Sequence, residues 1–237
     1  MWQTATDADI AEVAAAIGDR SRAKVLMALA GGGVLPASAL AAEAGVSVST
    51  ISGHLARLRE AKLLTVEHDG RHRYYRLAST DVARALEELA RIARPLPVTS
   101  LRDSVRNQAL MRARLCYDHL AGRLGVVLLA ALVDGDVLTG TAAGGYRITA
   151  AGLGRLAAFG IEVEEFSRRR PAIRYCVDWG ERRHHLAGAL GAAVADRLFA
   201  LGWLRRGRAR RVVHLTDEGR TGLNETFGVP LDWDEAE

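Results

Sequence analysis

The stretch VSVSTISGHLARLREAKLL, residues 46–64, decides how the N-terminal third of this chain folds. Ser47 is a good N-cap, and Gly45 ends a short helix, PASALAAEAG, directly before it. The apolar residues that recur at helical spacing, and so bury one face, are Ile51, Leu55 and Leu58. The opposite face presents small polar residues and Arg57. A short helix, a tight turn and a second helix with small exposed side chains predict a helix-turn-helix.

The segments around this stretch complete a winged helix. Helices are expected before it, over residues 6–18 and 21–30, and an amphipathic helix after it, over residues 79–95. Between them LLTVEHDGRHRYYRL alternates as two strands, with a type I′ turn predicted at Asp69-Gly70. The tip of this hairpin is basic, which favours a wing that contacts a nucleic-acid backbone.

Small side chains let a helix approach the major groove closely, hydroxyl groups bind phosphates or base edges, and arginine binds phosphate or guanine. The residues predicted to contact DNA are Ser47, Ser49, Thr50, Ser52, Gly53, His54 and Arg57 on the helix, with Arg71, His72 and Arg73 on the wing.

Residues 5–95 resemble the ArsR/SmtB family of bacterial winged-helix repressors. The most specific segments are VSVSTISGHLARLREAKLL and the G-R-x-x-Y-Y-R-L strand that follows it. The resemblance implies a homodimer in which the first and last helices of this module pair. It also implies binding to double-stranded DNA at an inverted-repeat operator, and release when an inducer binds.

The sites at which many relatives sense metals are missing from this N-terminal module. PASALAAEAG has no cysteine, and HLARLREAK has Arg57 and Ala61 where the cadmium- and lead-sensing branch has thiols. DVARALEELARI has no histidine, although another group uses aspartate and histidine on this closing helix. Any sensing must therefore lie elsewhere in the chain, or must not involve a metal.

The composition favours a helical protein of the cytoplasm. Hydrophobic residues make up 49% of the 237 residues and aromatic residues only 5%. The formal charge of +4 favours polyanionic partners. The beginning of the chain is polar, and the longest apolar run, residues 124–133, is too short to span a bilayer. No membrane partner is therefore expected. Two cysteines in a chain of this size, without a secretion signal, indicate reduced thiols.

The rest of the chain contains an internal repeat. HLAGRLGVVLLAALVDGDVL, from His119, matches HLAGALGAAVADRLFALGWL, from His185, without a gap. YRITAAG and VHLTDEG match further on, and each leads into a helix that Thr149 or Thr216 can cap. We expect a mainly α fold with small β-hairpins. It would consist of a winged-helix domain over residues 1–95 and a domain over residues 96–237. The second domain would contain two degenerate winged-helix-like units, at about 112–165 and 172–228, whose apolar central helices are buried.

The two cysteines occupy matching places in this repeat, within Arg-x-Cys-x-Asp. If the segment is helical, Cys116 and His119 share a face. The candidate metal or effector residues are Cys116, Asp118, His119, Cys176, Asp178, His184 and His185. Two thiolates and two imidazoles would suit zinc or a softer ion, and two nearby thiols could instead form a redox switch.

Structural explanations of the same residues remain open. A free cysteine is usually a small buried hydrophobe, and Arg114–Asp118 and Arg174–Asp178 could be i, i+4 ion pairs that only stabilise the fold. The spacing from cysteine to HLAG also differs by six residues between the copies, which weakens strict symmetry.

The sequence therefore predicts a DNA-binding transcriptional repressor released from its operator by an inducer, which could be a metal ion, a thiol-reactive ligand or a small molecule. The alternative is a winged-helix scaffold that binds proteins and not DNA. An enzyme is not predicted, because the chain lacks a nucleophile–base motif, a phosphate loop and a metalloprotease pattern.

Overall fold

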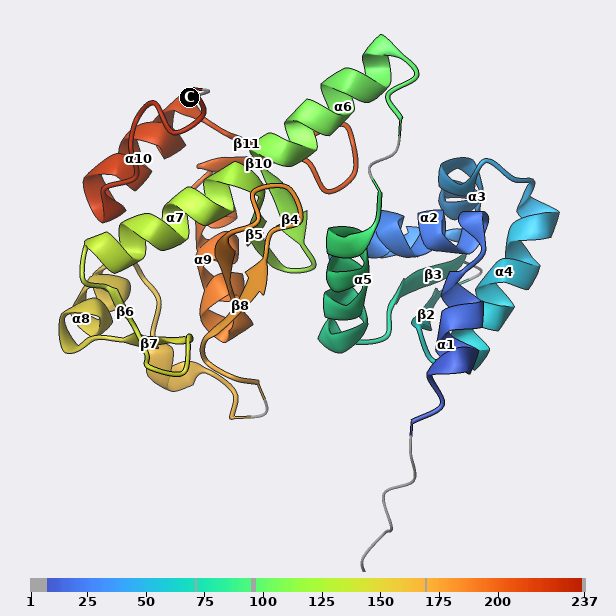
Figure 1. Cartoon of the computed structure of the whole chain (residues 1–237), viewed down its shortest axis with the longest axis horizontal. Helices are drawn as coiled ribbons and strands as arrows, with labels where there is room; N and C mark the ends of the chain where they lie inside the picture. Colours follow the sequence, from blue (N-terminus) through green and yellow to red (C-terminus); the bar gives the residue numbers. More distant parts are fainter. Residues whose placement is uncertain (1–7, 71, 95–96, 169, 236–237) are drawn as a thin grey trace, which may run out of the picture. The chain divides into compact units, whose positions relative to one another are not determined.

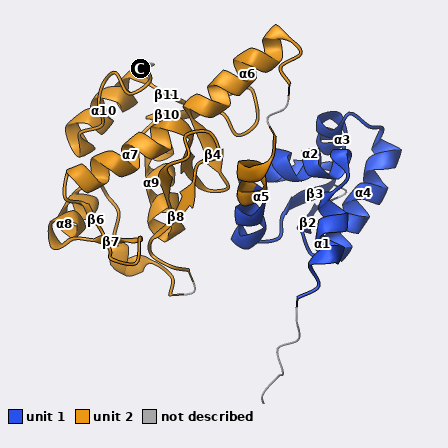
Figure 2. Cartoon of the chain, viewed as in Figure 1, with its two compact units in different colours: residues 1–86 blue, residues 87–237 orange. Residues whose placement is uncertain are grey.

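The chain divides into two compact units, residues 1–86 and 87–237 (Figure 2). The structure is a computed structural model that describes residues 8–70, 72–94, 97–168 and 170–235. The unit boundary falls inside helix α5 (Thr80–Ile92), whereas the predicted boundary after residue 95 lies outside the described residues. Among the described residues, no helix is both long and apolar enough to cross a membrane.

Unit 1 contains the predicted helix-turn-helix and hairpin (Figure 1). Its elements before α5 are α1 (Ile10–Ile17), α2 (Arg20–Leu29), β1 (Leu35–Pro36), α3 (Ala37–Ala44), α4 (Val48–Glu60), β2 (Leu64–Asp69) and β3 (His72–Leu77). The strands form one antiparallel sheet in the order β1-β3-β2.

Local signals in the sequence set the ends of these elements. Asp19 accepts a hydrogen bond at the start of α2, and Ser47 accepts one from the Thr50 amide at the start of α4. Gly45 ends α3 in the left-handed conformation, with φ of 73°. The hairpin turn lies one residue later than predicted, because Asp69 pairs with His72 and Gly70 is the first loop residue. The core of the unit includes Val25, Leu26, Leu29, Leu40, Ile51, Leu55 and Leu58.

Unit 2 alternates short hairpins with helices. Its elements after α5 are α6 (Leu101–Arg112), β4 (Arg114–Cys116), β5 (His119–Ala121), α7 (Gly122–Asp134), β6 (Leu138–Gly140), β7 (Tyr146–Ile148), α8 (Ala150–Ala158), the 3-10 helix η1 (Val163–Glu165), β8 (Arg174–Val177), β9 (His184–Ala187), α9 (Gly188–Ala200), β10 (Leu204–Arg206), β11 (Val213–Leu215) and α10 (Asp217–Phe227). Hairpin, helix, hairpin and helix thus occur twice, once from β4 to α8 and once from β8 to α10.

The structure of unit 2 corrects the expected helix around Cys116 and confirms the expected helix caps and buried central helices. The cysteine-bearing segments are strands, so the hypothesis that Cys116 and His119 lie on a helix is wrong. The expected caps are confirmed, since Thr149 and Thr216 accept hydrogen bonds at the starts of α8 and α10. The burial of α7 and α9 is also confirmed. The winged-helix-like character of the two copies stays a prediction.

Each central helix packs against the hairpin of the other copy: α7 contacts β9, and α9 contacts β5. Glycines in HLAGxLG make this approach close. A Cβ atom added at Gly125 of α7 would lie 3.4 Å from the His185 Cβ, and one added at Gly191 of α9 would lie 3.2 Å from the His119 Cβ. The reciprocal contacts relate the two copies by an approximate twofold arrangement that brings β5 beside β9.

Replacing Gly125 with alanine should destabilise unit 2. The new Cβ would lie 2.5 Å from the Leu120 carbonyl oxygen, which is backbone and cannot move aside easily. We expect a loss of about 1–3 kcal/mol in the free energy of urea unfolding. Gly154→Ala is the matched control, because nothing lies within 4 Å of its added Cβ, and this exposed helical site should gain about 0.5–1 kcal/mol. Equal stabilities of the two variants would contradict this packing.

Candidate functional site

The first candidate site is the exposed N-terminal part of α4. Most of the side chains predicted to contact DNA are exposed there, namely Ser47, Ser49, Thr50, Ser52, Gly53 and Arg57. The Ser47 hydroxyl lies 2.8 Å from both the Ser49 and the Thr50 hydroxyl oxygens, so three hydroxyl groups gather at the positive end of the helix dipole. His54 differs from the others. It is half-buried, and its Nδ1 lies 3.6 Å from an Asp19 carboxylate oxygen.

The hairpin after α4 places two more predicted residues at its tip. His72 and Arg73 are exposed at the start of β3, and Arg71 lies outside the described residues. The hairpin is held by its buried side, on which Leu64, Tyr75 and Leu77 pack. Arg76 and Glu67 form an ion pair of 2.6 Å on the other side. The basic tip therefore projects from a packed base, as a wing requires.

The second candidate site is a buried cluster in unit 2. One ligand atom from each of four residues lies within 4.8 Å of the other three, and these residues are Cys116, His119, Cys176 and His185. Each hairpin contributes two of them as direct cross-strand partners: Cys116 faces His119, and Cys176 faces His185. The unequal spacing from cysteine to histidine is absorbed by loops of different length, so the two hairpins keep the same register at the cluster.

An aspartate lies behind each imidazole. The Asp118 Oδ1 is 3.1 Å from the His119 Nδ1, and the Asp178 Oδ2 is 3.8 Å from the His185 Nδ1. The His119 Nε2 is 3.6 Å from the Cys176 sulfur, and the two imidazole rings stack with centroids 5.3 Å apart. Asp118 is fixed in turn by two hydrogen bonds from Arg170. In both histidines, Nδ1 thus faces the carboxylate of an aspartate.

The protonation states of the cluster differ between its members. The hydrogen bond with Cys116 lowers the pKa of Cys176, and that hydrogen bond together with burial raises the pKa of Cys116. Burial alone would lower the pKa of His119, but its hydrogen bonds to Asp118 and Cys176 outweigh burial and raise it. Burial lowers the pKa of His185. Cys176 is therefore the thiol that ionises first.

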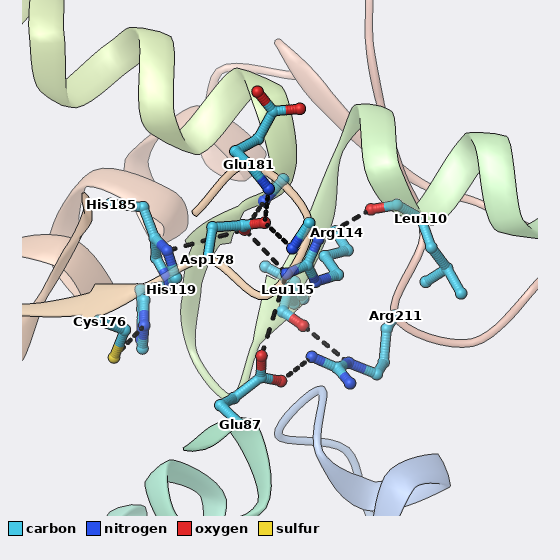
Figure 3. A network of polar contacts seen from close by, with 12 residues as sticks. Glu87, Leu110, Arg114, Leu115, His119, Cys176, Asp178, Glu181, His185 and Arg211 are labelled. Atoms are coloured by element: carbon cyan, nitrogen blue, oxygen red, sulfur yellow. Dashed lines mark hydrogen bonds and ion pairs between the residues drawn. The ribbon is translucent and has the colours of Figure 1, made fainter. Parts of the chain in front are cut away.

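Asp178 connects the cluster to a buried network (Figure 3). Its Oδ2 accepts hydrogen bonds from Arg114 Nη2 at 2.8 Å and from the Gly122 amide at 2.7 Å. Its Oδ1 accepts two from the amides of Gly180 and Glu181. Burial opposes ionisation of Asp178, but Arg114 and these amides outweigh it and lower the pKa.

The network continues from Arg114 to helix α5. Arg114 is fully buried, stacks on the Trp179 ring at 4.2 Å and lies 3.9 Å from the Glu87 carboxylate. Glu87 also pairs with Arg211, whose Nε donates to the Leu115 carbonyl at 3.0 Å. Figure 3 shows this path from His185 through Asp178 and Arg114 to Glu87.

These pairs replace the local ones considered from the sequence. Arg114 does not pair with Asp118 four residues away but with Asp178 of the other copy, and Asp118 pairs with Arg170.

Of the seven candidate residues, four converge and two aspartates support the imidazoles. His184 points elsewhere: its Nδ1 is 3.0 Å from the Tyr146 hydroxyl, and it lines a cavity of about 460 Å³. Glu87 and Trp179 were not singled out from the sequence, because nothing local marks their long-range contacts.

Comparison with known proteins identifies the family. A model described as a helix-turn-helix domain matches residues 17–67. The uncharacterized HTH-type transcriptional regulator YdfF of Bacillus subtilis (strain 168) is 38% identical over 94% of this chain and 99% of its own length. The chain belongs to the HTH-type transcriptional regulators. Because this match spans both units, family membership is not limited to the helix-turn-helix.

Two further proteins are each similar to about a third of this HTH-type regulator. The HTH-type transcriptional regulator CmtR of Mycobacterium tuberculosis is 37% identical over 35% of this chain and 70% of its own length. A solution structure from Mycobacterium bovis, a homodimeric winged helix-turn-helix domain described as a possible ArsR-family regulator, is 29% identical. It covers 36% of this chain and 86% of that one, with a TM-score of 0.32.

Removing the Arg114 guanidinium should strongly destabilise unit 2 of this regulator. Arg114→Ala would leave the buried Asp178 carboxylate without its charged partner, which costs about 3–5 kcal/mol. Arg91→Ala is the control, because its ion pair with Glu88 is solvent-exposed and is worth no more than about 1 kcal/mol. Urea unfolding of both variants measures the difference. If Arg114→Ala were no less stable than Arg91→Ala, Asp178 would not depend on this pair.

Proposed function

We propose that this HTH-type regulator is a transcriptional repressor that binds double-stranded DNA through α4 and the β2–β3 wing. The observation that supports this most directly is the exposed polar face at the start of α4. A recognition helix enters the major groove with its N-terminal residues against base edges, so the side chains there must be small or able to form hydrogen bonds. Ser49, Thr50 and Gly53 meet this requirement, and Arg57 follows one turn later.

Electrostatics would supply most of the affinity. The positive end of α4 and the cation of Arg57 would lie against phosphate groups. Arg73 on the wing would add a second cationic contact beside the recognition helix. A scaffold module, the alternative function, has no need for this arrangement of hydroxyl groups and arginines on one helix and one hairpin.

We further propose that the functional species is a homodimer that binds an inverted repeat. Exposed apolar side chains mark the helices that the family resemblance pairs between subunits. On α1, Ile10 is 77% exposed and Val13 is 38% exposed, and on α5, Ile92 is 70% exposed and Leu89 is 43% exposed. Such side chains are stabilised when a second copy covers them.

Unit 2 would receive the inducer. For an inducer to release DNA, it must bind the conformation of low DNA affinity more tightly than the DNA-bound conformation.

A DNA target also implies the cytoplasm, where free thiols stay reduced. Cys116 and Cys176 are both free thiols in the structure, which fits this compartment.

Neutralising Arg57 and Arg73 together should weaken DNA binding at every sequence. The probe is a duplex that the wild-type protein selects from a random-sequence library. For Arg57→Ala combined with Arg73→Ala, we expect a weaker dissociation constant and a salt slope that falls by about 1 for each lost phosphate contact. Fluorescence anisotropy at several salt concentrations measures both.

Arg147→Ala is the matched control, because Arg147 is equally exposed but lies on β7 of unit 2. It should bind the selected duplex as the wild type does. A library that yields no selected duplex, or a double variant with unchanged affinity and salt slope, would favour the scaffold instead.

A charge on α5 should dissociate the dimer. Ile92→Glu alters an exposed side chain, so the folded chain should persist while burial of the glutamate between subunits becomes costly. We expect a shift from dimer to monomer in sedimentation velocity. Leu101→Glu, at an 83% exposed position of α6, is the control and should remain dimeric. A wild-type monomer at micromolar concentration would refute the dimer.

A further inference from the structure

We propose that Cys116, His119, Cys176 and His185 form a tetrahedral site for one divalent thiophilic metal ion such as Zn²⁺, and that this ion is the inducer. The inducer role rests on the proposed function, whereas the binding site does not. Neither cysteine belongs to the helix-turn-helix, so this site differs from any within the N-terminal module.

The spacing of the donor atoms fits such an ion. Zinc binds thiolate sulfur at about 2.3 Å and imidazole nitrogen at about 2.0–2.1 Å, so a tetrahedral site places sulfur and nitrogen about 3.5 Å apart. The Cys176 sulfur and the His119 Nε2 are already 3.6 Å apart, and all four donor atoms lie within 4.8 Å of one another. Small side-chain rotations would close the remaining distances around an ion.

The unpaired imidazole of His185 points to a missing ligand. His185 is fully buried, and neither of its ring nitrogens has a hydrogen-bond partner among the described residues. A buried polar group without a partner costs about 1–3 kcal/mol. A metal ion bound to Nε2 would satisfy that nitrogen, and Nδ1 would then donate its proton toward the Asp178 carboxylate, now 3.8 Å away.

The aspartates complete an arrangement that metal sites use repeatedly. Histidines that bind metals commonly donate the other ring N–H to a carboxylate, which fixes the ring and its tautomer. The Asp118 carboxylate is placed to accept such a hydrogen bond from the His119 Nδ1. The Asp178 carboxylate faces the His185 Nδ1 in the same way in the other copy. A role for the cysteines as a redox pair would explain neither the imidazoles nor the two carboxylates behind them.

Charge and hardness also favour this class of ion. Two thiolates would balance the two positive charges of the ion, and two neutral imidazoles would complete a neutral site, as burial requires. Sulfur and imidazole nitrogen select zinc and softer ions over calcium or magnesium, which prefer oxygen. The same donors would accept several thiophilic ions.

The position of the site explains how an ion could act on α5. Each repeat supplies one cysteine and one histidine, so the ion would cross-link the two hairpins. Drawing His185 toward the ion would change its distance to Asp178, and the same Asp178 oxygen binds Arg114, which lies 3.9 Å from Glu87. Glu87 is on α5, a continuous helix that begins in unit 1.

Cobalt titration of the reduced full-length protein tests the site directly. Tetrahedral Co²⁺ with thiolate ligands has intense visible and near-ultraviolet bands, and Zn²⁺ should displace it at one equivalent per chain. Cys176→Ser and His185→Ala should abolish or strongly reduce these bands. Asp178→Asn should weaken affinity by about 10- to 100-fold. His184→Ala is the matched control, because the neighbouring side chain faces Tyr146, and should titrate as wild type.

Two outcomes would overturn the proposed metal site. An equal spectrum for His185→Ala and His184→Ala would exclude His185 as a ligand. The absence of thiolate–Co²⁺ bands in the wild type, together with a Cys116–Cys176 disulfide on mild oxidation, would show a redox pair instead. Circular dichroism of each variant separates ligand loss from unfolding, and the half-buried Cys176 position tolerates serine more readily than Cys116.

A DNA-binding measurement tests the inducer role separately. Adding Zn²⁺ to the wild-type complex with its selected duplex should lower DNA affinity by about 5- to 150-fold. Cys176→Ser should bind the duplex but ignore Zn²⁺. Stoichiometric metal binding with unchanged DNA affinity would overturn the inducer role and leave DNA binding intact. Failure to bind any duplex, with normal Co²⁺ spectra, would instead overturn the proposed function.

Discussion

The carboxylate of Asp178 is the constraint on which the C-terminal unit depends. It is completely buried, so its charge must be compensated within the protein. Arg114 and three backbone amides provide four hydrogen bonds, and these tie the loop between β8 and β9 to β4 and to the start of α7. The two copies of the repeat are thereby fixed face to face. The convergence of two cysteines and two histidines follows from this pairing of hairpins.

Glycine makes the same arrangement sterically feasible. Gly125 and Gly191 stand at matching places in the repeated HLAGxLG, and each lies beside the Cβ of a histidine from the other copy. Packing of this kind explains why the repeat keeps glycine and alanine on helices that could otherwise use larger apolar residues. It also means that the repeat is both a structural unit and the frame of the cluster. Burial in the core therefore does not fully explain the cysteines, because each sulfur also lies within 4.8 Å of two imidazole nitrogens.

Much of unit 1 could be predicted from the sequence because its signals are local. The period of Ile51, Leu55 and Leu58, the caps at Ser47 and Gly45, and the Asp-Gly hairpin each depend on a few neighbouring residues. In unit 2 the local signals were weaker. Strands of three residues such as β4 and β5 show no period, and HLAG before a helix resembles a helix start. Arg114 and Asp178 are 64 residues apart, so their ion pair could not be inferred from i, i+4 spacing.

In the function proposed here, the two candidate sites would divide the work of a regulator between the two units. The polar start of α4 and the basic wing offer contacts to a duplex, and the buried cluster offers soft donors to an ion. The central claim is that the duplicated hairpins together build one metal site. X-ray absorption at the zinc edge of the zinc-loaded full-length protein tests it most directly. We predict an inner shell of two sulfur atoms at about 2.3 Å and two nitrogen atoms at about 2.0–2.1 Å. A shell of oxygen and nitrogen without sulfur would contradict this account.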